Sequence, residues 1–200
     1  MGVKKKKKKV KPGIMWNLST TIRNPERILG FAEVFKKFEG KNWKDKQTQT
    51  DFQIALIQHK KYSPKVQDLT KSQLALMKKQ GPMKASQARD IWNYFANPNN
   101  SVHKVSYDGP GQEGHRGRES ASPLSKLGLW FKKSDGKVKL TTICKQLVAD
   151  ELSLSDLFYY WIFFYQLPQN NKDSSYSRAK GYDIKPFIAI LQLIDKVNGC

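Results

Sequence analysis

Two short fragments with a central glycine place an acidic residue two positions before a lysine, which is the spacing used by many magnesium-dependent nucleases. In such enzymes the carboxylates hold the metal ion and the lysine lies beside it. The fragments are Glu39-Gly40-Lys41 and Asp135-Gly136-Lys137. Neither is preceded by an apolar strand with an acid at the required place, and a helix end and a hairpin turn account for them. We therefore predict no catalytic residue in this chain.

The histidines and cysteines show no spacing that is typical of a metal site, and no Cys-x-x-Cys pair occurs. These residues are His59, His103, His115, Cys144 and Cys200. The segment Gly109-Pro110-Gly111 lacks the Gly-Lys-Ser/Thr ending of a phosphate-binding loop. We expect no metal or other cofactor in this chain. Two distant cysteines also argue against a disulfide framework and favour a cytoplasmic location.

Positive charge is the strongest signal in the sequence. The 200 residues include 36 Lys and Arg against 17 Asp and Glu, a formal net charge of +19, so we expect an anionic partner. Lysines occupy residues 4–9 and 11, and we expect residues 1–13 to be a disordered arm. The arm adds phosphate attraction, acts as a nuclear localisation signal or has no dedicated role. No apolar run is long enough to span a membrane, so we expect no membrane association.

Nine basic residues lie around a glycine-rich segment and an expected hairpin. A single lysine is more often an ordinary solvated charge, so their collective placement carries the interpretation. Lysines supply phosphate contacts, whereas an arginine can hydrogen-bond guanine O6 and N7 together, which favours Arg116 and Arg118 as base contacts. The predicted DNA-binding residues are Lys84, Arg89, Arg116, Arg118, Lys126, Lys132, Lys133, Lys137 and Lys139.

Four helices are expected in a helical N-terminal subdomain, residues 14–97. Asn24-Pro25-Glu26 combines a capping residue, a proline and an acid, which predicts a helix over about 25–38 that ends at Gly40. Apolar periodicity and breaks predict further helices. They cover about residues 48–60, 70–80 and 85–96. Residues 98–121 are rich in glycine and contain Arg116 and Arg118, so they are expected to be a Gly-rich basic loop. Loops of this length are usually functional or disordered, and the positive charges favour contact with nucleic acid.

Residues 122–200 are expected to form a winged-helix-like subdomain with C-terminal helices. Apolar and basic residues alternate around Asp135-Gly136, which predicts a β-hairpin. Thr141 or Thr142 would cap the next helix. The order of helix, hairpin and helix is typical of a winged helix-turn-helix with the hairpin as the wing. The expected fold class is mainly α with a small β-hairpin, in winged helix-turn-helix-like DNA-recognition subdomains.

Two helices are expected at the end of the chain. The aromatic run over about residues 153–165 is too short to cross a bilayer and predicts a helix that is buried on most sides, as core rather than as a stacking platform. Residues 184–197 predict an amphipathic helix with Pro186 in its first turn.

Several segments occur in an order that resembles the AlwI family of restriction endonucleases. Together they cover most of the chain after the lysine-rich leader, which makes the resemblance more specific than any single motif. The segments are Asn24-Pro25-Glu26-Arg27, residues 38–44 with Gln49 and Phe52, Arg118-Glu119, Pro123-Leu124, Leu127-Gly128-Leu129, Lys139-Leu140-Thr141 and residues 158–166.

The resemblance implies a bacterial type IIS enzyme of a restriction-modification system, which reads a short asymmetric DNA site and cuts nearby with Mg²⁺. In that family a recognition region of winged-helix-like subdomains precedes a separate nuclease domain. We expect this chain to end before the nuclease domain, and so to recognise double-stranded DNA while a nuclease domain or second subunit supplies cleavage with its magnesium.

Two other functions remain open from the sequence alone. A stand-alone winged-helix transcription regulator or architectural DNA-binding protein would bind a palindromic site as a symmetric dimer. An RNA-binding protein would prefer single-stranded or A-form RNA over duplex DNA.

Overall fold

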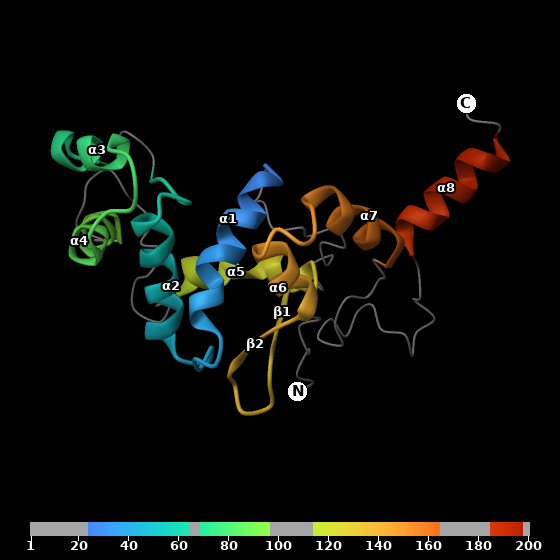
Figure 1. Ribbon diagram of the computed structural model, residues 1–200, viewed down its shortest axis with the longest axis horizontal. Coiled ribbons are helices and arrows are strands. Elements are labelled where there is room, and N and C mark those ends of the chain that lie inside the picture. The colour runs from blue at the N-terminus through green and yellow to red at the C-terminus, as the bar shows by residue number, and fades with distance from the viewer. Residues whose placement is uncertain (1–23, 65–68, 97–113, 165–184, 198–200) are drawn as a thin grey trace, which may run out of the picture. The chain divides into compact units, whose positions relative to one another are not determined.

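The computed structural model describes residues 24–64, 69–96, 114–164 and 185–197, and these residues are mainly helical with one small antiparallel sheet (Figure 1). The chain divides into two compact units. The main unit, Leu18–Tyr159, contains the sheet. The other unit contains, among the described residues, 160–164 and 185–197. The predicted fold, mainly α with one hairpin, is confirmed. The predicted lysine arm lies outside the described residues.

A side-chain hydrogen bond at the residue before Pro25 marks the start of the first helix. Asn24 Oδ1 accepts a hydrogen bond from the amide of Glu26 at 2.9 Å, which satisfies one of the free amides at a helix start. Helix α1 follows over Glu26–Phe35 and continues as the 3-10 turn η1 over Lys36–Phe38. Gly40 then adopts a φ of +81°, a conformation that favours glycine and ends the helix. The predicted opening helix is confirmed.

Capping residues also fix the starts of the next two helices. Asp45 accepts hydrogen bonds from two amides in the first turn of α2 (Lys46–Gln58), which therefore begins slightly earlier than the sequence predicts. Helix α3 (Lys71–Lys78) begins with a capping box, in which Thr70 and Gln73 each accept a hydrogen bond from the other's backbone amide. Both helices were expected.

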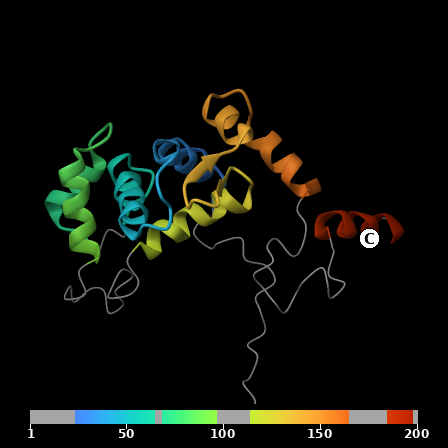
Figure 2. The same ribbon diagram turned by 90° about the horizontal axis from the view of Figure 1, so that it is seen from below.

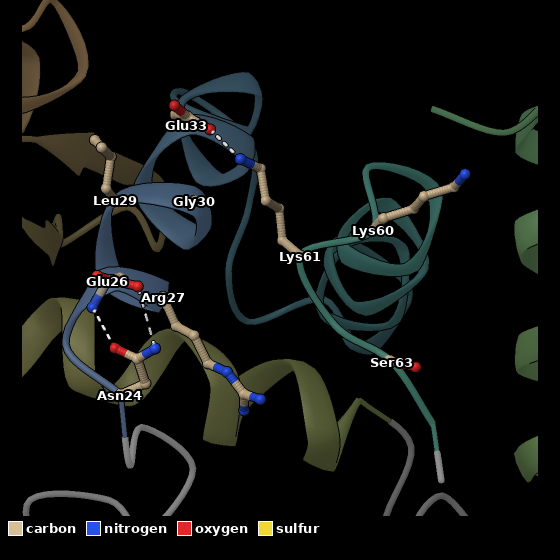
Figure 3. A pocket seen from close by; sticks show the side chains of 9 residues that line it. All are labelled: Asn24, Glu26, Arg27, Leu29, Gly30, Glu33, Lys60, Lys61 and Ser63. Atoms are coloured by element: carbon tan, nitrogen blue, oxygen red, sulfur yellow. Dashed lines mark hydrogen bonds and ion pairs between the residues drawn. The ribbon is translucent and has the colours of Figure 1, made fainter. Parts of the chain in front are cut away.

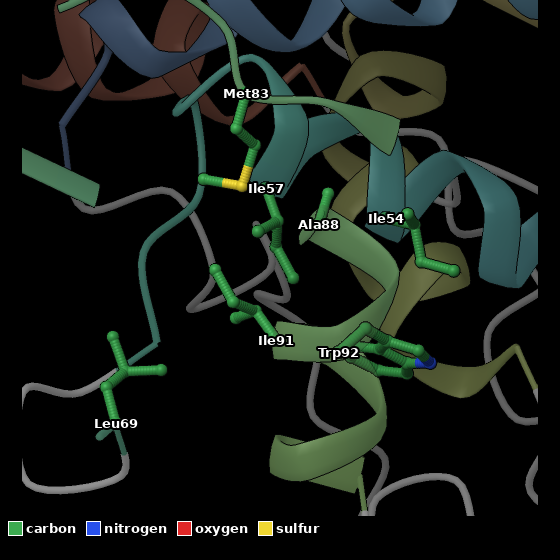
Figure 4. Packing of buried hydrophobic residues seen from close by; sticks show 7 residues of the cluster. All are labelled: Ile54, Ile57, Leu69, Met83, Ala88, Ile91 and Trp92. Atoms are coloured by element: carbon green, nitrogen blue, oxygen red, sulfur yellow. The ribbon is translucent and has the colours of Figure 1, made fainter. Parts of the chain in front are cut away.

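Helix α4 (Ala85–Ala96) packs on α2 through a small hydrophobic cluster (Figure 4). Ile91 and Ala88 on α4 are fully buried, as is Ile57 on α2. Burial of such side chains is the main favourable term that holds the helix pair together. The cluster consists of Ile54, Ile57, Leu69, Met83, Ala88, Ile91 and Trp92.

The largest difference from the sequence prediction is helix α5, His115–Lys126, which occupies part of the expected loop. Residues 97–113 lie outside the described residues, so only the end of the loop prediction can be compared, and there it is wrong. Gly117, one of the glycines that suggested a loop, allows α5 to approach α2, together with the small side chain of Ser120. A Cβ atom at Gly117 would collide with the backbone carbonyl of Gln49, and Ser120 is buried against Gln53.

The hairpin forms as the sequence predicts. Strand β1 (Trp130–Lys132) pairs antiparallel with β2 (Val138–Leu140), and Phe131 faces Lys139 across the pair. Gly136 closes the turn with a φ of +87°, which explains the Asp-Gly sequence at the tip.

A segment that the sequence left unassigned lines the outer edge of β2. Gly40 donates to the carbonyl of Val138, and the amide of Val138 donates to the carbonyl of Lys41, both at 2.9 Å. Trp43 donates to Gly136 at 2.9 Å, and Asn42 forms a single β-bridge with Lys137. The segment 40–43 therefore joins the end of η1 to the sheet in the order 40–43, β2, β1.

Aromatic side chains from both sides of the predicted loop form one core in the main unit. The ring of Phe35 lies 4.9 Å from the rings of both Phe52 and Trp130 and 5.1 Å from Trp43. Trp130 Nε1 also donates to the carbonyl of Ala121 on α5 at 3.0 Å. The helices before residue 97 and the hairpin after residue 122 thus share a core, which fixes the sheet on α1, α2 and α5 (Figure 2).

The last helices match in position but one differs in burial. Thr141 caps α6 (Thr142–Val148) as predicted. Helix α7 (Leu154–Phe164) was expected to be buried on most sides, but Tyr159 is 62% and Tyr160 56% exposed, so that expectation is wrong for its described residues. An aromatic run of this kind carries no period that tells which side is covered.

Helix α8 (Pro186–Lys196) has Pro186 in its first turn, as predicted. Phe187 packs on Trp161 in the same unit, with ring centres 5.6 Å apart. Several of its apolar side chains are half-exposed among the described residues, with Leu193 at 60%.

The close approach of α5 to α2 gives a stability prediction. Gly117→Ala should lower the free energy of unfolding by about 1–3 kcal/mol, because the added methyl group meets backbone atoms that cannot move aside. Gly30→Ala is the matched control, since Gly30 is also a buried helical glycine but faces the flexible stem of Lys61 (Figure 3). It should leave stability unchanged or raise it by up to about 1 kcal/mol through helix propensity. Urea unfolding measures both, and equal effects would contradict the proposed packing.

Candidate nucleic-acid interface

The nine predicted DNA-binding residues fall into three places in the main unit. Two lie on or beside α4, three lie on α5, and four lie on the hairpin. The groups are Lys84 and Arg89, then Arg116, Arg118 and Lys126, then Lys132, Lys133, Lys137 and Lys139. In both Figure 1 and Figure 2, α2 lies between α4 and the hairpin, so the first group is not brought together with the third.

The hairpin presents its lysines to solvent. The side chains of Lys133, Lys137 and Lys139 are about half-exposed, and Lys132 is exposed. Asp135 lies between two of them, with Oδ2 3.9 Å from the Nζ atoms of both Lys133 and Lys137. Its pKa is lowered mainly by a hydrogen bond from the Lys137 amide and also by the two ammonium groups. Asp135 therefore stays ionised, and the positive excess of the hairpin comes from four lysines against this one carboxylate.

Two further lysines join this surface, and sequence reasoning missed them. The hydrogen bonds of segment 40–43 bring Lys41 and Lys44 beside β2, and two side-chain carbons of Lys44 lie 3.2 and 3.3 Å from where a Cβ atom of Gly136 would be. Lys41 Nζ lies 4.6 Å from the ring centre of Phe38. A pairing between such distant parts of the chain leaves no local period in the sequence, so no sequence signal was available. We call the six residues the wing lysines: Lys41, Lys44, Lys132, Lys133, Lys137 and Lys139.

Glu39 anchors one edge of this surface. Its Oε1 lies 3.5 Å from Lys139 Nζ and its Oε2 lies 3.4 Å from Lys145 Nζ, while the amide of Leu140 donates to it at 3.3 Å. Desolvation alone would raise the pKa of Glu39, but the Leu140 hydrogen bond and the two lysines outweigh it and hold the pKa below its ordinary value. The carboxylate therefore links η1, β2 and α6 through charge.

Polar contacts fix α5 on α2. Arg118 Nη1 donates to Gln49 Oε1 at 2.6 Å, and Gln49 Nε2 in turn donates to the carbonyl of Trp43 at 2.6 Å. Ser120 donates to Gln53 Oε1 at 2.9 Å in the buried interface. Arg118 is also a predicted base contact, and its guanidinium serves the packing of α5 on α2. Lys126, at the other end of α5, is half-buried, and burial lowers its pKa.

The outward side of α5 follows from its buried side. Gly117, Ser120, Ala121, Pro123 and Leu124 are buried, and a helix turns by about 100° per residue. The face away from these residues carries His115, Glu119, Ser122 and Lys126, all of them partly exposed. Arg116 lies at the border of this face, where its Nη1 lies 3.5 Å from Glu119 Oε2. His115 Nε2 lies 3.3 Å from Glu119 Oε1.

The α4 residues are placed differently. Arg89 Nη2 donates to Asp51 Oδ1 on α2 at 3.1 Å, and both side chains are well exposed. Lys84 is exposed, and its amide donates to Gln87 at the start of α4. An exposed pair of this kind adds little stability. These two residues remain predicted phosphate contacts outside the hairpin surface.

A hollow between α1 and the end of α2 is a weaker candidate for an anion site (Figure 3). It contains the cations Arg27, Lys60 and Lys61, but Glu26 and Glu33 line it as well. Lys61 Nζ lies 2.8 Å from Glu33 Oε2, so part of its charge is already matched. The hollow therefore has no strong preference for a phosphate.

The described residues also bear on metal binding, thiol reactivity and membrane spanning. No group of three His, Cys, Asp or Glu side chains there is placed to hold a metal ion. Cys144 is buried, and burial raises its pKa to about 11, so its thiol is not a nucleophile at neutral pH. No helix in the described part of the chain is long and apolar enough to cross a membrane. Comparison with protein-family models, curated proteins and solved structures found no match.

The Glu39 contacts predict a pH-dependent stability. Because the folded-state pKa lies below the ordinary value of 4.5, the carboxylate stabilises the fold above that pH, and this stability is lost as pH falls through the folded-state pKa. Glu39→Gln keeps an acceptor for Leu140 but removes the charge. Urea unfolding should show the wild type more stable than the variant at pH 7, with the difference vanishing in strong acid. A difference that is the same at both pH values would contradict the role of the charge.

Proposed function

We propose that the main unit binds double-stranded DNA sequence-specifically as a winged-helix module. Helix α5 enters the major groove, and the β1–β2 hairpin acts as the wing on the phosphate backbone. The observation that carries this proposal is the arrangement of the segment 40–43, β2 and β1 beside α5, with α5 anchored on both α1 and α2.

The order of elements supports the proposal. A helix, a short edge segment, a second helix, a third helix and a hairpin follow one another as α1, 40–43, α2, α5 and β1–β2. Helices α3 and α4 are then an insertion between the second and third helices. In a helix-turn-helix unit the later helix reads the groove while the earlier one braces it, and here α2 braces α5 through Gln49 and Gln53.

Charge supports the same partner. Six wing lysines lie along one sheet edge and hairpin, opposed there by the carboxylates of Asp135 and Glu39. The chain as a whole carries a formal charge of +19. Lysines that neutralise phosphates release counterions and supply most of the sequence-independent affinity.

We further propose that this module is the recognition part of a type IIS restriction endonuclease of the AlwI type. This step is supported by the ordered segments that resemble that family. The role proposed for the described residues is recognition, because they offer no ligand set for Mg²⁺. Cleavage would come from a nuclease domain or a second subunit.

Selection from random duplexes tests the function. The chain should enrich one asymmetric site of about four to six base pairs, with binding that weakens steeply as salt rises. A palindromic site would favour a dimeric regulator over the restriction enzyme. Stronger binding to RNA, or no enrichment of any duplex, would contradict sequence-specific DNA binding.

Variants of the wing lysines test the binding mode. Lys132→Ala and Lys137→Ala should each weaken binding to all duplexes alike and lower the slope of log affinity against log salt by about 1, because each loses a phosphate contact. Lys71→Ala on α3 makes the same change at an exposed lysine away from the hairpin, and should change binding less. Electrophoretic mobility shifts at several salt concentrations measure the slopes. Equal effects at the three positions would contradict the proposal that the hairpin binds the phosphate backbone.

A further inference from the structure

We propose that Glu119 reads cytosine in the major groove, by accepting a hydrogen bond from the N4 amino group of that base. The proposal rests on the proposed function, since it requires α5 to face the bases. It adds a specificity-determining residue and the chemical identity of one base that it recognises.

The packing of α5 decides which side chains face the groove. Gly117 contacts the backbone of Gln49 so closely that no Cβ atom fits, and Ser120 is hydrogen-bonded to Gln53. These contacts fix the rotation of the helix about its own axis. Glu119 then lies on the outward face, towards Arg116, with its side chain 40% exposed.

The carboxylate of Glu119 is held from two sides. His115 Nε2 lies 3.3 Å from Oε1 one turn earlier, and Arg116 Nη1 lies 3.5 Å from Oε2. Pairs at these spacings lie on one helix side and restrict the side chain to few rotamers. The acid is thus oriented before any ligand arrives, which lowers the entropy cost of binding.

A carboxylate at this place would weaken DNA binding unless it met a donor. Phosphates repel it, and Glu119 is the one acidic residue within the α5 sequence. The positive charge of Arg116 beside it offsets this repulsion without removing the acceptor. An oriented acceptor among cations is therefore suited to selecting a base rather than to adding affinity.

The major-groove edges of the bases then single out cytosine. Guanine presents two acceptors, and thymine presents an acceptor and a methyl group. Neither base offers a hydrogen-bond donor to a carboxylate in the major groove. Adenine presents an amino donor beside the N7 acceptor. Cytosine presents the N4 amino group, and Glu and Asp are the side chains that accept from it.

The experiment is duplex selection with the wild type, Glu119→Gln and Glu119→Ala. The wild-type site should contain a fixed cytosine whose replacement weakens binding by roughly 5- to 150-fold, the range expected for one good base contact. Glu119→Ala should lose the preference at that one position and keep the others. Glu119→Gln should shift it toward adenine, because an amide can pair with adenine N6 and N7 together.

Glu33→Gln is the matched control. It makes the same chemical change at a carboxylate on α1 that is 42% exposed and pairs with Lys61, and it should leave the selected site unchanged. A second readout needs no variant. N4-methylcytosine at the fixed position places a methyl group where the major-groove hydrogen stood, and should weaken wild-type binding without affecting Glu119→Ala.

The outcomes separate this inference from the function on which it rests. If the wild type enriches a site but Glu119→Ala keeps every base preference, the assignment of Glu119 is overturned while DNA recognition stands. A wild-type site without a fixed cytosine overturns it too. If the wild type enriches no duplex, both proposals fall.

Discussion

The contact between Gly117 and the backbone of Gln49 is the constraint on which the rest of the main unit depends. Two helices can approach so closely only where one of them has no side chain, and glycine in a helix interior costs stability relative to alanine. Burial of Ser120 and Leu124 against the neighbouring elements offsets that cost. Since the approach leaves no room for the helix to roll, one glycine fixes both the depth and the rotation of α5.

Gln49 extends this constraint to the sheet. Its side chain accepts from Arg118 on α5 and donates to the carbonyl of Trp43, the residue that pairs with the hairpin at Gly136. A buried amide whose two ends are both bonded is strongly specified, because moving it leaves polar groups unsatisfied. The side chain of Gln49 therefore fixes the positions of both α5 and the segment 40–43, beside which Lys41 and Lys44 lie. The proposed binding mode, with α5 in the groove and the hairpin on the phosphates, requires such a fixed mutual position.

Local signals predicted most of the helices and the hairpin, and non-local packing accounts for what they missed. The helix-start signals and the hairpin turn depend only on residues close in sequence, so the sequence predicts them. They are the side-chain hydrogen bond at Asn24, the caps at Thr70 and Thr141, and the Asp-Gly turn. Helix α5 was hidden because small residues that serve helix packing are the same types that form loops. The pairing of Asn42 with Lys137 joins distant parts of the chain and has no sequence period. At the candidate site, the exposed lysines of the hairpin were predicted from charge and spacing. Lys41 and Lys44 could be added only once the pairing of segment 40–43 with β2 was known.

Sequence reasoning considered the arginines of α5 and not the neighbouring Glu119. A guanidinium suits guanine, so charge alone favours Arg116 and Arg118, yet the spacing of Arg116 and Glu119 already implies that they meet on a helix. A surface of uniform positive charge binds any duplex, and discrimination is a difference between affinities. Under the proposed function, the carboxylates of Glu39 and Glu119 would lower the affinity for every duplex, and only a correctly placed donor would restore it. Rotation of α5 by one residue, about 100°, would turn Glu119 off the outward face, so the base contact proposed for Glu119 depends on the absence of a side chain at Gly117.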